Sequence, residues 1–373
     1  MKERIFLASP HMSDAGYELE YIKDAFNKNW IAPLGENVNE FEKALLDYTG
    51  AESAVALSSG TAALHLALIL AGVGRGDTVF CQDLTFSASA NPIAYLGARP
   101  VFIDSERETW NLDPAALKKA FELYGAPKAV VAVHLYGTPA KMDEISRICS
   151  DHGTALIEDA AEALGSKYRG RMCGTLGSFG ALSFNGNKII TTSGGGMLLC
   201  RSGEQAKHAL KLATQAREPF PWYQHEEIGY NYRLSNISAG IGRGQMKVIE
   251  ERVAKKRGIF AAYAAAFADL PLTMSPCLTD SEPNRWLSAA LLDDASGKMP
   301  AEVIAALAGE SIEARHVWKP MHMQPVFAGC PFVSASDEPV SEELFSRGLC
   351  LPSDTKMTAE QQEAVISVVR SLF

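Results

Sequence analysis

The stretch Ser183-Phe184-Asn185-Gly186-Asn187-Lys188 closes an apolar, strand-like run and is followed by the glycine-rich Ser193-Gly194-Gly195-Gly196. A lysine in this position, directly after a buried strand and among groups able to hold an anion, can form a Schiff base with a carbonyl compound. Most lysines are solvated surface groups, so Lys188 indicates this chemistry only if other segments supply partners for it.

One such segment is Ser58-Ser59-Gly60-Thr61, which lies between the apolar run 54–57 and an apolar helical pattern over 62–71. Backbone N–H groups and the positive end of that helix meet at one point, which suits a phosphate. Gly60 allows a close backbone approach, and the hydroxyls of Ser59 and Thr61 add donors. Taken alone, the motif is equally compatible with an ordinary helix N-cap that holds no ligand.

A second segment is Ile157-Glu158-Asp159-Ala160-Ala161-Glu162 at the end of another apolar run. A buried carboxylate such as Asp159 needs a cationic partner, and the protonated pyridine nitrogen of pyridoxal phosphate is one. A helix N-cap is the alternative role for Asp159. Phe86 follows a third run and can lie flat against the ring, although aromatic residues after strands more often join a core. Together these segments predict pyridoxal phosphate as cofactor.

Composition restricts the class of protein. The chain has 373 residues, 47% hydrophobic and 21% charged, which predicts a globular enzyme with two lobes. A net charge of −9 disfavours a nucleic-acid partner. The apolar stretch 62–73 is too short to span a bilayer, the first residues lack a secretory pattern, and the seven scattered cysteines suggest reduced thiols. We therefore expect a cytoplasmic protein without a membrane partner.

Short apolar runs alternate with helical patterns through the first 200 residues; the runs are 54–57, 78–81, 101–103, 129–134, 155–157, 181–184 and 197–200. This alternation predicts an α/β fold with a mostly parallel seven-stranded sheet flanked by helices, and ligands beyond the carboxyl ends of its strands. A long helical stretch over 239–267 and a proline-rich remainder follow. We expect a large cofactor-binding domain over 1–245, then a linker helix and a small α+β domain over 246–373.

Further motifs occur at residues 31–35, 59–64, 85–86, 134–137, 158–161, 187–188 and 229–236. In order and spacing, over nearly the whole chain, they resemble the DegT/DnrJ/EryC1/StrS sugar aminotransferases, which are fold-type I pyridoxal phosphate enzymes. The resemblance implies a homodimer with shared active sites. It also implies two groups of site residues. Lys188 carries the cofactor, Asp159 faces its pyridine nitrogen and Phe86 stacks on its ring. The remaining cofactor contacts are Ser59, Gly60, Thr61, Glu162, Ser183 and, from the neighbouring subunit, Asn231.

One departure narrows the resemblance. Many relatives read Gly-Glu-Gly-Gly where this chain has residues 193–196. With Glu162 and the segment 214–218, this pattern is similar to the branch that acts on UDP-linked 4-keto-6-deoxy-N-acetylglucosamine, as in bacillosamine-type glycan pathways. Relatives that dehydrate deoxysugars have histidine in place of the lysine, so Lys188 favours transamination, with L-glutamate as the donor. The alternatives are another nucleotide-linked keto sugar, a carbocyclic ketone, or a non-catalytic cofactor-binding regulator.

The substrate side is expected to carry arginines, because a sugar nucleotide has a diphosphate and glutamate has two carboxylates. Arg217, Arg233 and Arg315 are the candidates, with His316 beside the last and with Ala32 and Pro33 in the N-terminal loop. A surface salt bridge is the alternative role for each arginine. His316 and His322 have no further ligand at metal-binding spacing, so we expect no metal site.

Overall fold

The computed structural model describes residues 3–373, and among them the largest sheet has eight strands in the order β1-β9-β8-β5-β4-β2-β3-β14. The strands are β1 (Ser53–Leu57), β2 (Thr78–Gln82), β3 (Arg99–Ile103), β4 (Ala129–Val133), β5 (Ala155–Asp159), β8 (Phe179–Ser183), β9 (Gly196–Cys200) and β14 (Phe332–Val333). Only β9 runs antiparallel to its neighbours, β1 and β8. The seven expected strands and the mostly parallel arrangement are confirmed.

The eighth strand corrects the expected strand number. β14 pairs in parallel with β3, through Phe332 opposite Phe102 and Val333 opposite Ile103. It is two residues long and belongs to the proline-rich part of the chain, so it has no periodicity that a sequence pattern can register.

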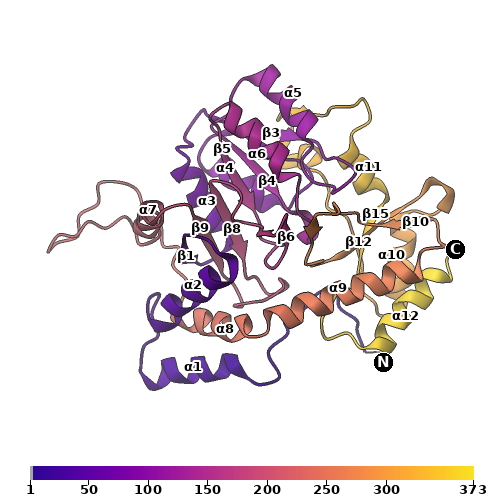
Figure 1. Ribbon diagram of the computed structural model, residues 1–373, viewed down its shortest axis with the longest axis horizontal. Coiled ribbons are helices and arrows are strands. Elements are labelled where there is room, and N and C mark those ends of the chain that lie inside the picture. Colours follow the sequence, from indigo (N-terminus) through magenta and orange to yellow (C-terminus); the bar gives the residue numbers. More distant parts are fainter. Residues whose placement is uncertain (1–2) are drawn as a thin grey trace.

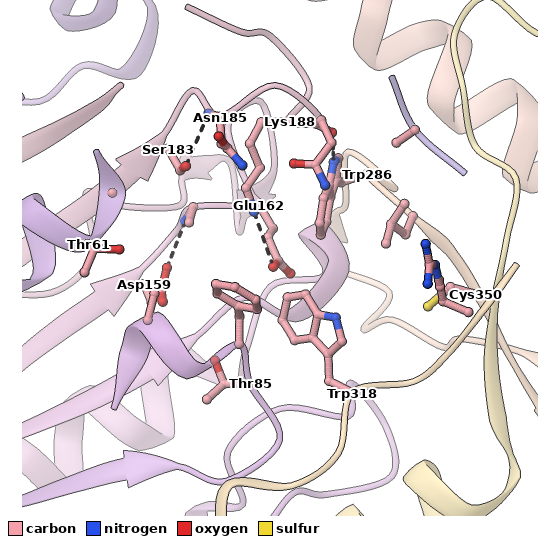
Figure 2. A pocket seen from close by; sticks show the side chains of 18 of the residues that line it. Thr61, Thr85, Asp159, Glu162, Ser183, Asn185, Lys188, Trp286, Trp318 and Cys350 are labelled. Carbon is pink, nitrogen blue, oxygen red and sulfur yellow. Dashed lines mark hydrogen bonds and ion pairs between the residues drawn. The ribbon is translucent and has the colours of Figure 1, made fainter. Parts of the chain in front are cut away.

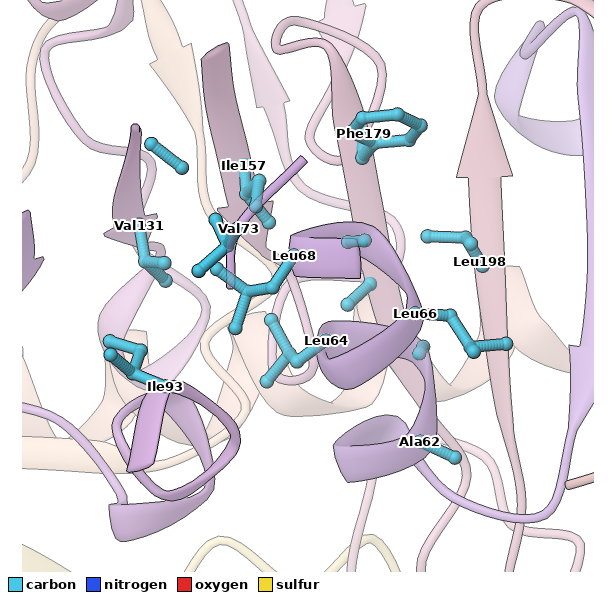
Figure 3. Close-up of a cluster of buried hydrophobic side chains, with 14 of the residues drawn as sticks. Ala62, Leu64, Leu66, Leu68, Val73, Ile93, Val131, Ile157, Phe179 and Leu198 are labelled. Atoms are coloured by element: carbon cyan, nitrogen blue, oxygen red, sulfur yellow. The ribbon is translucent and has the colours of Figure 1, made fainter. Parts of the chain in front are cut away.

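Helices cover both faces of this sheet. Successive residues of a strand point to opposite sides, and the apolar side chains on each side pack against helices. Val79 and Cys81 pack with α3 (Gly60–Leu70), α4 (Asn91–Tyr95) and α7 (Gly203–Ala213). Phe80 faces the other way, toward α5 (Pro114–Tyr124) and α6 (Met142–Asp151). Figure 3 shows Leu64 and Leu68 of α3 directed at Val131 and Ile157 of the sheet. The apolar sequence of α3 is thus explained by its central position.

The prediction of one long helical stretch over 239–267 is wrong. This part of the chain forms two helices, α8 (Asn236–Met246) and α9 (Ile249–Ala266). The chain leaves helical geometry at Val248, with φ −118° and ψ 8°. α8 lies beside α1 (Tyr17–Asn27) and α2 (Glu36–Thr49), whereas α9 runs from them to the opposite side of the molecule (Figure 1). The break lets one helix pack on the N-terminal helices and the next reach the second sheet.

The second sheet is antiparallel, in the order β10-β12-β15-β13. Its strands are β10 (Leu272–Met274), β12 (Ser288–Leu292), β13 (Arg315–His316) and β15 (Gly348–Leu351), and α9, α10 (Pro300–Gly309) and α12 (Ala359–Arg370) pack against it. The other short elements are β6 (Lys167–Tyr168), β7 (Arg171–Met172), β11 (Ser281–Glu282) and α11 (Val340–Arg347). The division of the chain into two domains near residue 246 remains a prediction. β14 lies beyond this boundary in the sequence but pairs with the large sheet.

No helix among residues 3–373 combines the length and the apolar composition that crossing a bilayer requires.

Candidate active site

A cavity of about 920 Å³ opens beyond the carboxyl ends of strands in the large sheet. Its walls are the segments that follow β1, β2, β5 and β8, together with residues 286–287 and 313–319 from the second half of the chain. In Figure 2 Thr61, Asp159 and Ser183 lie on one side of Lys188, and Trp286 and Trp318 lie on the other. The cavity therefore has a polar wall from the large sheet and an aromatic wall from the smaller lobe.

The first turn of α3 forms one end of the polar wall. Ser59 caps this helix, and its Oγ accepts a hydrogen bond from the N–H of Ala62 at 3.0 Å. The N–H groups of Gly60 and Thr61 have no acceptor within the helix, as in any first turn. A Cβ on Gly60 would lie 2.9 Å from the Cβ of Ser183, so this approach requires glycine. The turn offers a phosphate several donors and the positive helix end.

The glycine run after Lys188 supports this turn. A Cβ on Gly196, the first residue of β9, would collide with the backbone of Ser59 and Gly60. The first turn of α3 therefore packs directly against β9, the strand that follows the lysine loop.

Lys188 projects from the loop between β8 and β9 into the cavity, and its side chain is 12% exposed. Its Nζ lies 3.6 Å from Oε1 of Glu162 and 4.1 Å from the ring centre of Trp286. The indole Nε1 of Trp286 donates to the carbonyl of Asn187 at 2.7 Å, which fixes the ring beside the lysine. The amine is thus held between a carboxylate and an aromatic face.

Asp159 ends β5 and is buried at the cavity floor. Its Oδ2 accepts from Ser89 Oγ at 2.6 Å, and its Oδ1 accepts from the N–H of Ala161 at 3.1 Å. Phe86 lies in the same cavity with 56% of its surface exposed, and its ring centre is 5.5 Å from that of Trp318. An exposed aromatic ring and a buried carboxylate in one cavity are groups that a planar cationic ring can contact.

Glu162 is buried between Lys188 and the turn after β4. Its Oε2 accepts from the N–H of Tyr136 at 2.6 Å. Burial raises the pKa of Glu162 to about 7, an effect that Asp159 strengthens and Lys188 opposes. The group can therefore take up or release a proton near neutral pH.

We expect the cofactor-free protein to lose stability as Glu162 ionises. Its pKa is 4.5 before folding and about 7 after, so the folded state binds the proton more tightly. This contribution is complete below pH 4.5 and falls by about 3 kcal/mol as the pH rises to 7. Denaturant unfolding of Glu162→Gln should accordingly show a gain over wild type that grows across this window. The exposed control Glu363→Gln should show no such trend, and a pH-independent difference for Glu162→Gln would contradict the assignment.

The structure brings together most of the predicted residues. Those that line the cavity are Ser59, Gly60, Thr61, Phe86, Asp159, Glu162, Ser183, Lys188, Arg315 and His316. Those that do not line it are Ala32, Pro33, Arg217, Arg233 and Asn231. Arg233 instead lies 3.5 Å from Glu42 and donates to the carbonyl of Pro33 at 3.4 Å.

Asn231 is exposed and does not line the cavity of its own chain. Tyr230 and Tyr232 stack on each other with ring centres 4.9 Å apart, and both pack on His65 of α3. Side chains alternate along extended backbone, so Asn231 faces the opposite way, and it is exposed. Arg217 is also exposed and lies over the ring of Tyr223, in the segment between α7 and α8.

Sequence reasoning missed the aromatic wall. Trp318 follows the Arg315-His316 pair, and its backbone N–H donates to the Tyr136 hydroxyl at 3.0 Å. Its position in the sequence, next to two candidate substrate residues, could have indicated that it lines the cavity. Trp286 had none, because it reaches Lys188 only through the packing of the smaller lobe.

Comparisons with known proteins agree with this geometry. The sequence model of the DegT/DnrJ/EryC1/StrS aminotransferase family matches residues 13–370. EpsN of Bacillus subtilis (strain 168), named as a pyridoxal phosphate-dependent aminotransferase, is 52% identical over 100% of this chain and 97% of its own length. GDP-perosamine synthase of Caulobacter vibrioides is 36% identical over 98% and 97%. A crystal structure of a DegT DnrJ EryC1 StrS aminotransferase from Brucella abortus has a TM-score of 0.88 at 28% identity, covering 96% of this chain and 95% of its own.

The residues present also fit the cofactor of such enzymes. A lysine amine, a buried carboxylate and a helix N-terminus with close-packed Gly60 face one cavity, which is the set of groups that pyridoxal phosphate requires. The chain therefore belongs to the DegT/DnrJ/EryC1/StrS aminotransferase family and is a sugar aminotransferase that uses pyridoxal phosphate.

Proposed function

We propose that this enzyme transfers the amine of L-glutamate to the C4 ketone of a UDP-linked 4-keto-6-deoxy-N-acetylhexosamine, in bacterial glycan biosynthesis. The observation that carries the proposal is the Lys188 amine held 3.6 Å from Glu162 inside the cavity. Glu162 and the segments 193–196 and 214–218 are the features similar to the UDP-sugar branch.

Arg315, His316 and Lys319 give the cavity three basic side chains on its C-terminal wall. Arg315 and His316 are exposed, and Arg315 is paired with Glu313 at 2.8 Å, so an incoming anion would compete with that carboxylate for the guanidinium. In this proposal they serve the carboxylates of glutamate and the diphosphate of the sugar nucleotide in turn.

The cofactor would be held by the large sheet. Ser59, Gly60 and Thr61 surround its phosphate together with Ser183, Asp159 faces the pyridine nitrogen, and Phe86 covers the ring. Bound in this way, pyridoxal phosphate supplies an electron sink for the carbanion at the substrate carbon.

Lys188 Nζ is the group that moves the proton at the substrate carbon. An amine acts as a base only when it is neutral. Glu162, whose pKa is raised to about 7 by burial, is the carboxylate that faces this amine, at 3.6 Å. Trp286 and Trp318 form an apolar wall beside this amine, which limits the access of water to it.

We further propose a homodimer with shared sites. The segment between α7 and α8 projects from the body of the chain (Figure 1), and its exposed apolar side chains are Phe220, Trp222, Tyr223 and Ile228. Exposed aromatic residues on a projecting segment favour a protein partner. Asn231, which is exposed and outside its own cavity, would reach the phosphate of the second subunit, and Arg217 on the same segment would reach its substrate.

A substrate panel tests the choice of sugar nucleotide. Glutamate and UDP-, GDP- and dTDP-linked 4-keto-6-deoxy sugars are offered separately, and the amino sugar is quantified by mass spectrometry and assigned by NMR. We expect kcat/KM for the UDP-linked N-acetyl sugar to exceed the others by at least about tenfold, the size of one hydrogen bond left unmade.

Two outcomes of the panel would overturn the proposal. A preference for the GDP-linked sugar would place the enzyme with its GDP-perosamine synthase relative. Absence of 2-oxoglutarate formation from glutamate, with cofactor bound, would show that glutamate is not the amino donor.

A further inference from the structure

A buried chain of hydroxyl groups leads to the carboxylate of Asp159. Ser89 Oγ donates to Asp159 Oδ2 at 2.6 Å, and Thr85 Oγ1 lies 2.6 Å from Ser89 Oγ. Ser89 and Thr85 are completely buried, and Asp159 is 5% exposed. Nothing in the function derived above uses Ser89.

The direction of this chain follows from counting hydrogens. A serine hydroxyl has one hydrogen to donate, and Ser89 gives it to Asp159. In the contact between Thr85 and Ser89, the threonine must then be the donor. Both hydroxyl dipoles point toward the carboxylate, and such chains strengthen in a buried environment. The two hydroxyls therefore form a buried chain of donors that ends on Oδ2 of Asp159.

The same chain fixes the orientation of Asp159. Its two oxygens accept from different donors, Oδ2 from Ser89 and Oδ1 from the N–H of Ala161. Two bonds from separate segments define the plane of the carboxylate. A single bond would leave the group free to rotate about its terminal torsion.

The turn that holds Ser89 also presents Phe86. The N–H of Ser89 donates to the carbonyl of Phe86 at 3.1 Å, within the turn that contains residues 87–89. Phe86 extends into the cavity from this turn, while Ser89 lies under Asp159. One short turn thus sets the ring-stacking residue and the carboxylate relative to each other.

We propose that Ser89 is a positioning residue, supported by Thr85, that orients the carboxylate of Asp159 toward the pyridine nitrogen of the cofactor. This inference rests on the role proposed above for Asp159. It predicts that Ser89 influences the cofactor only through that carboxylate.

The experiment measures the cofactor nitrogen directly. Pyridoxamine phosphate labelled with ¹⁵N in the ring is bound to wild type, Ser89→Ala, Ser89→Thr, Ser87→Ala and Asp159→Asn, and to Ser89→Ala combined with Asp159→Asn. The ¹⁵N NMR shift reports protonation of the ring, and titration gives the dissociation constant. Ser87 lies in the same turn and outside the cavity lining, so Ser87→Ala is the matched control.

We expect Ser89→Ala to move the ¹⁵N signal toward the unprotonated position and to weaken binding about tenfold, as for a lost bond to a charged acceptor. Its kcat should fall by about tenfold or more, with the KM for glutamate within about twofold of wild type. Ser89→Thr should restore all three measurements, and Ser87→Ala should leave them unchanged. In the Asp159→Asn background, Ser89→Ala should cause no further change.

The outcomes separate the inference from its premise. If Ser89→Ala keeps the wild-type signal while Asp159→Asn shifts it, the inference about Ser89 is wrong. If Asp159→Asn also keeps the signal, the role of Asp159 is wrong. Equal losses from Ser89→Ala in both backgrounds would indicate a structural role alone. Should Ser89→Ala fail to fold, Thr85→Val removes only the outer hydroxyl and should shift the signal in the same direction by less, and an unshifted signal there overturns the inference.

Discussion

Lys188→Ala is expected to abolish transamination, lowering kcat by about 10⁴-fold or more, while pyridoxamine phosphate still binds. The large effect follows from the two roles proposed for Nζ, which are to carry the cofactor and to move the proton, because general acid–base catalysis alone contributes about 10²–10⁴-fold. Binding persists because Asp159, Phe86 and the first turn of α3 come from other segments.

Two measurements check this expectation. Single-turnover assays with glutamate report the lost chemistry, and titration with pyridoxamine phosphate reports the retained binding. Lys207→Ala, on the exposed side of α7, is the matched control and should behave as wild type. Wild-type turnover in Lys188→Ala would remove Lys188 from its role.

Mixing two inactive variants is expected to restore activity. Each proposed site combines Lys188 of one subunit with Asn231 of the other. Lys188→Ala lacks the reactive amine, and Asn231→Asp places a negative charge against the phosphate, so each homodimer should be inactive. In the mixed dimer both defects fall on one site and the other is intact. Isolated through two different affinity tags, this dimer should reach about half the wild-type rate, as expected for one working site of two.

A double variant provides the opposite pattern. When Lys188→Ala and Asn231→Asp are on the same subunit and the partner is wild type, the shared arrangement damages both sites, so the mixed dimer should be inactive. Sites built from single chains would give the reverse result: no activity when Lys188→Ala is mixed with Asn231→Asp, and half activity when the double variant is mixed with wild type. That pair of results would refute the shared site.

The sequence predicts most of the large sheet and the polar wall of the cavity for a physical reason. Buried parallel strands are short apolar runs, and residues such as Thr61, Asp159 and Lys188 lie at or shortly after their carboxyl ends, so local patterns are enough. The break at Val248 and the strand β14 depend on contacts between distant segments, and they were missed. Trp286 and Trp318 belong to the same class, since only tertiary packing brings them to the lysine. The outward direction of Asn231 also needed the structure, because it depends on Tyr230 and Tyr232 packing against His65.

The late position of β14 has a consequence for biosynthesis. The ribosome delivers β3 with residues 99–103, but its parallel partner at Phe332–Val333 is synthesised long afterwards. Until then β3 has unpaired backbone groups along one side, and an open strand edge is a template for association with other chains. A nascent or truncated chain that ends before residue 332 is thus exposed to aggregation at the edge that the finished enzyme closes with two residues.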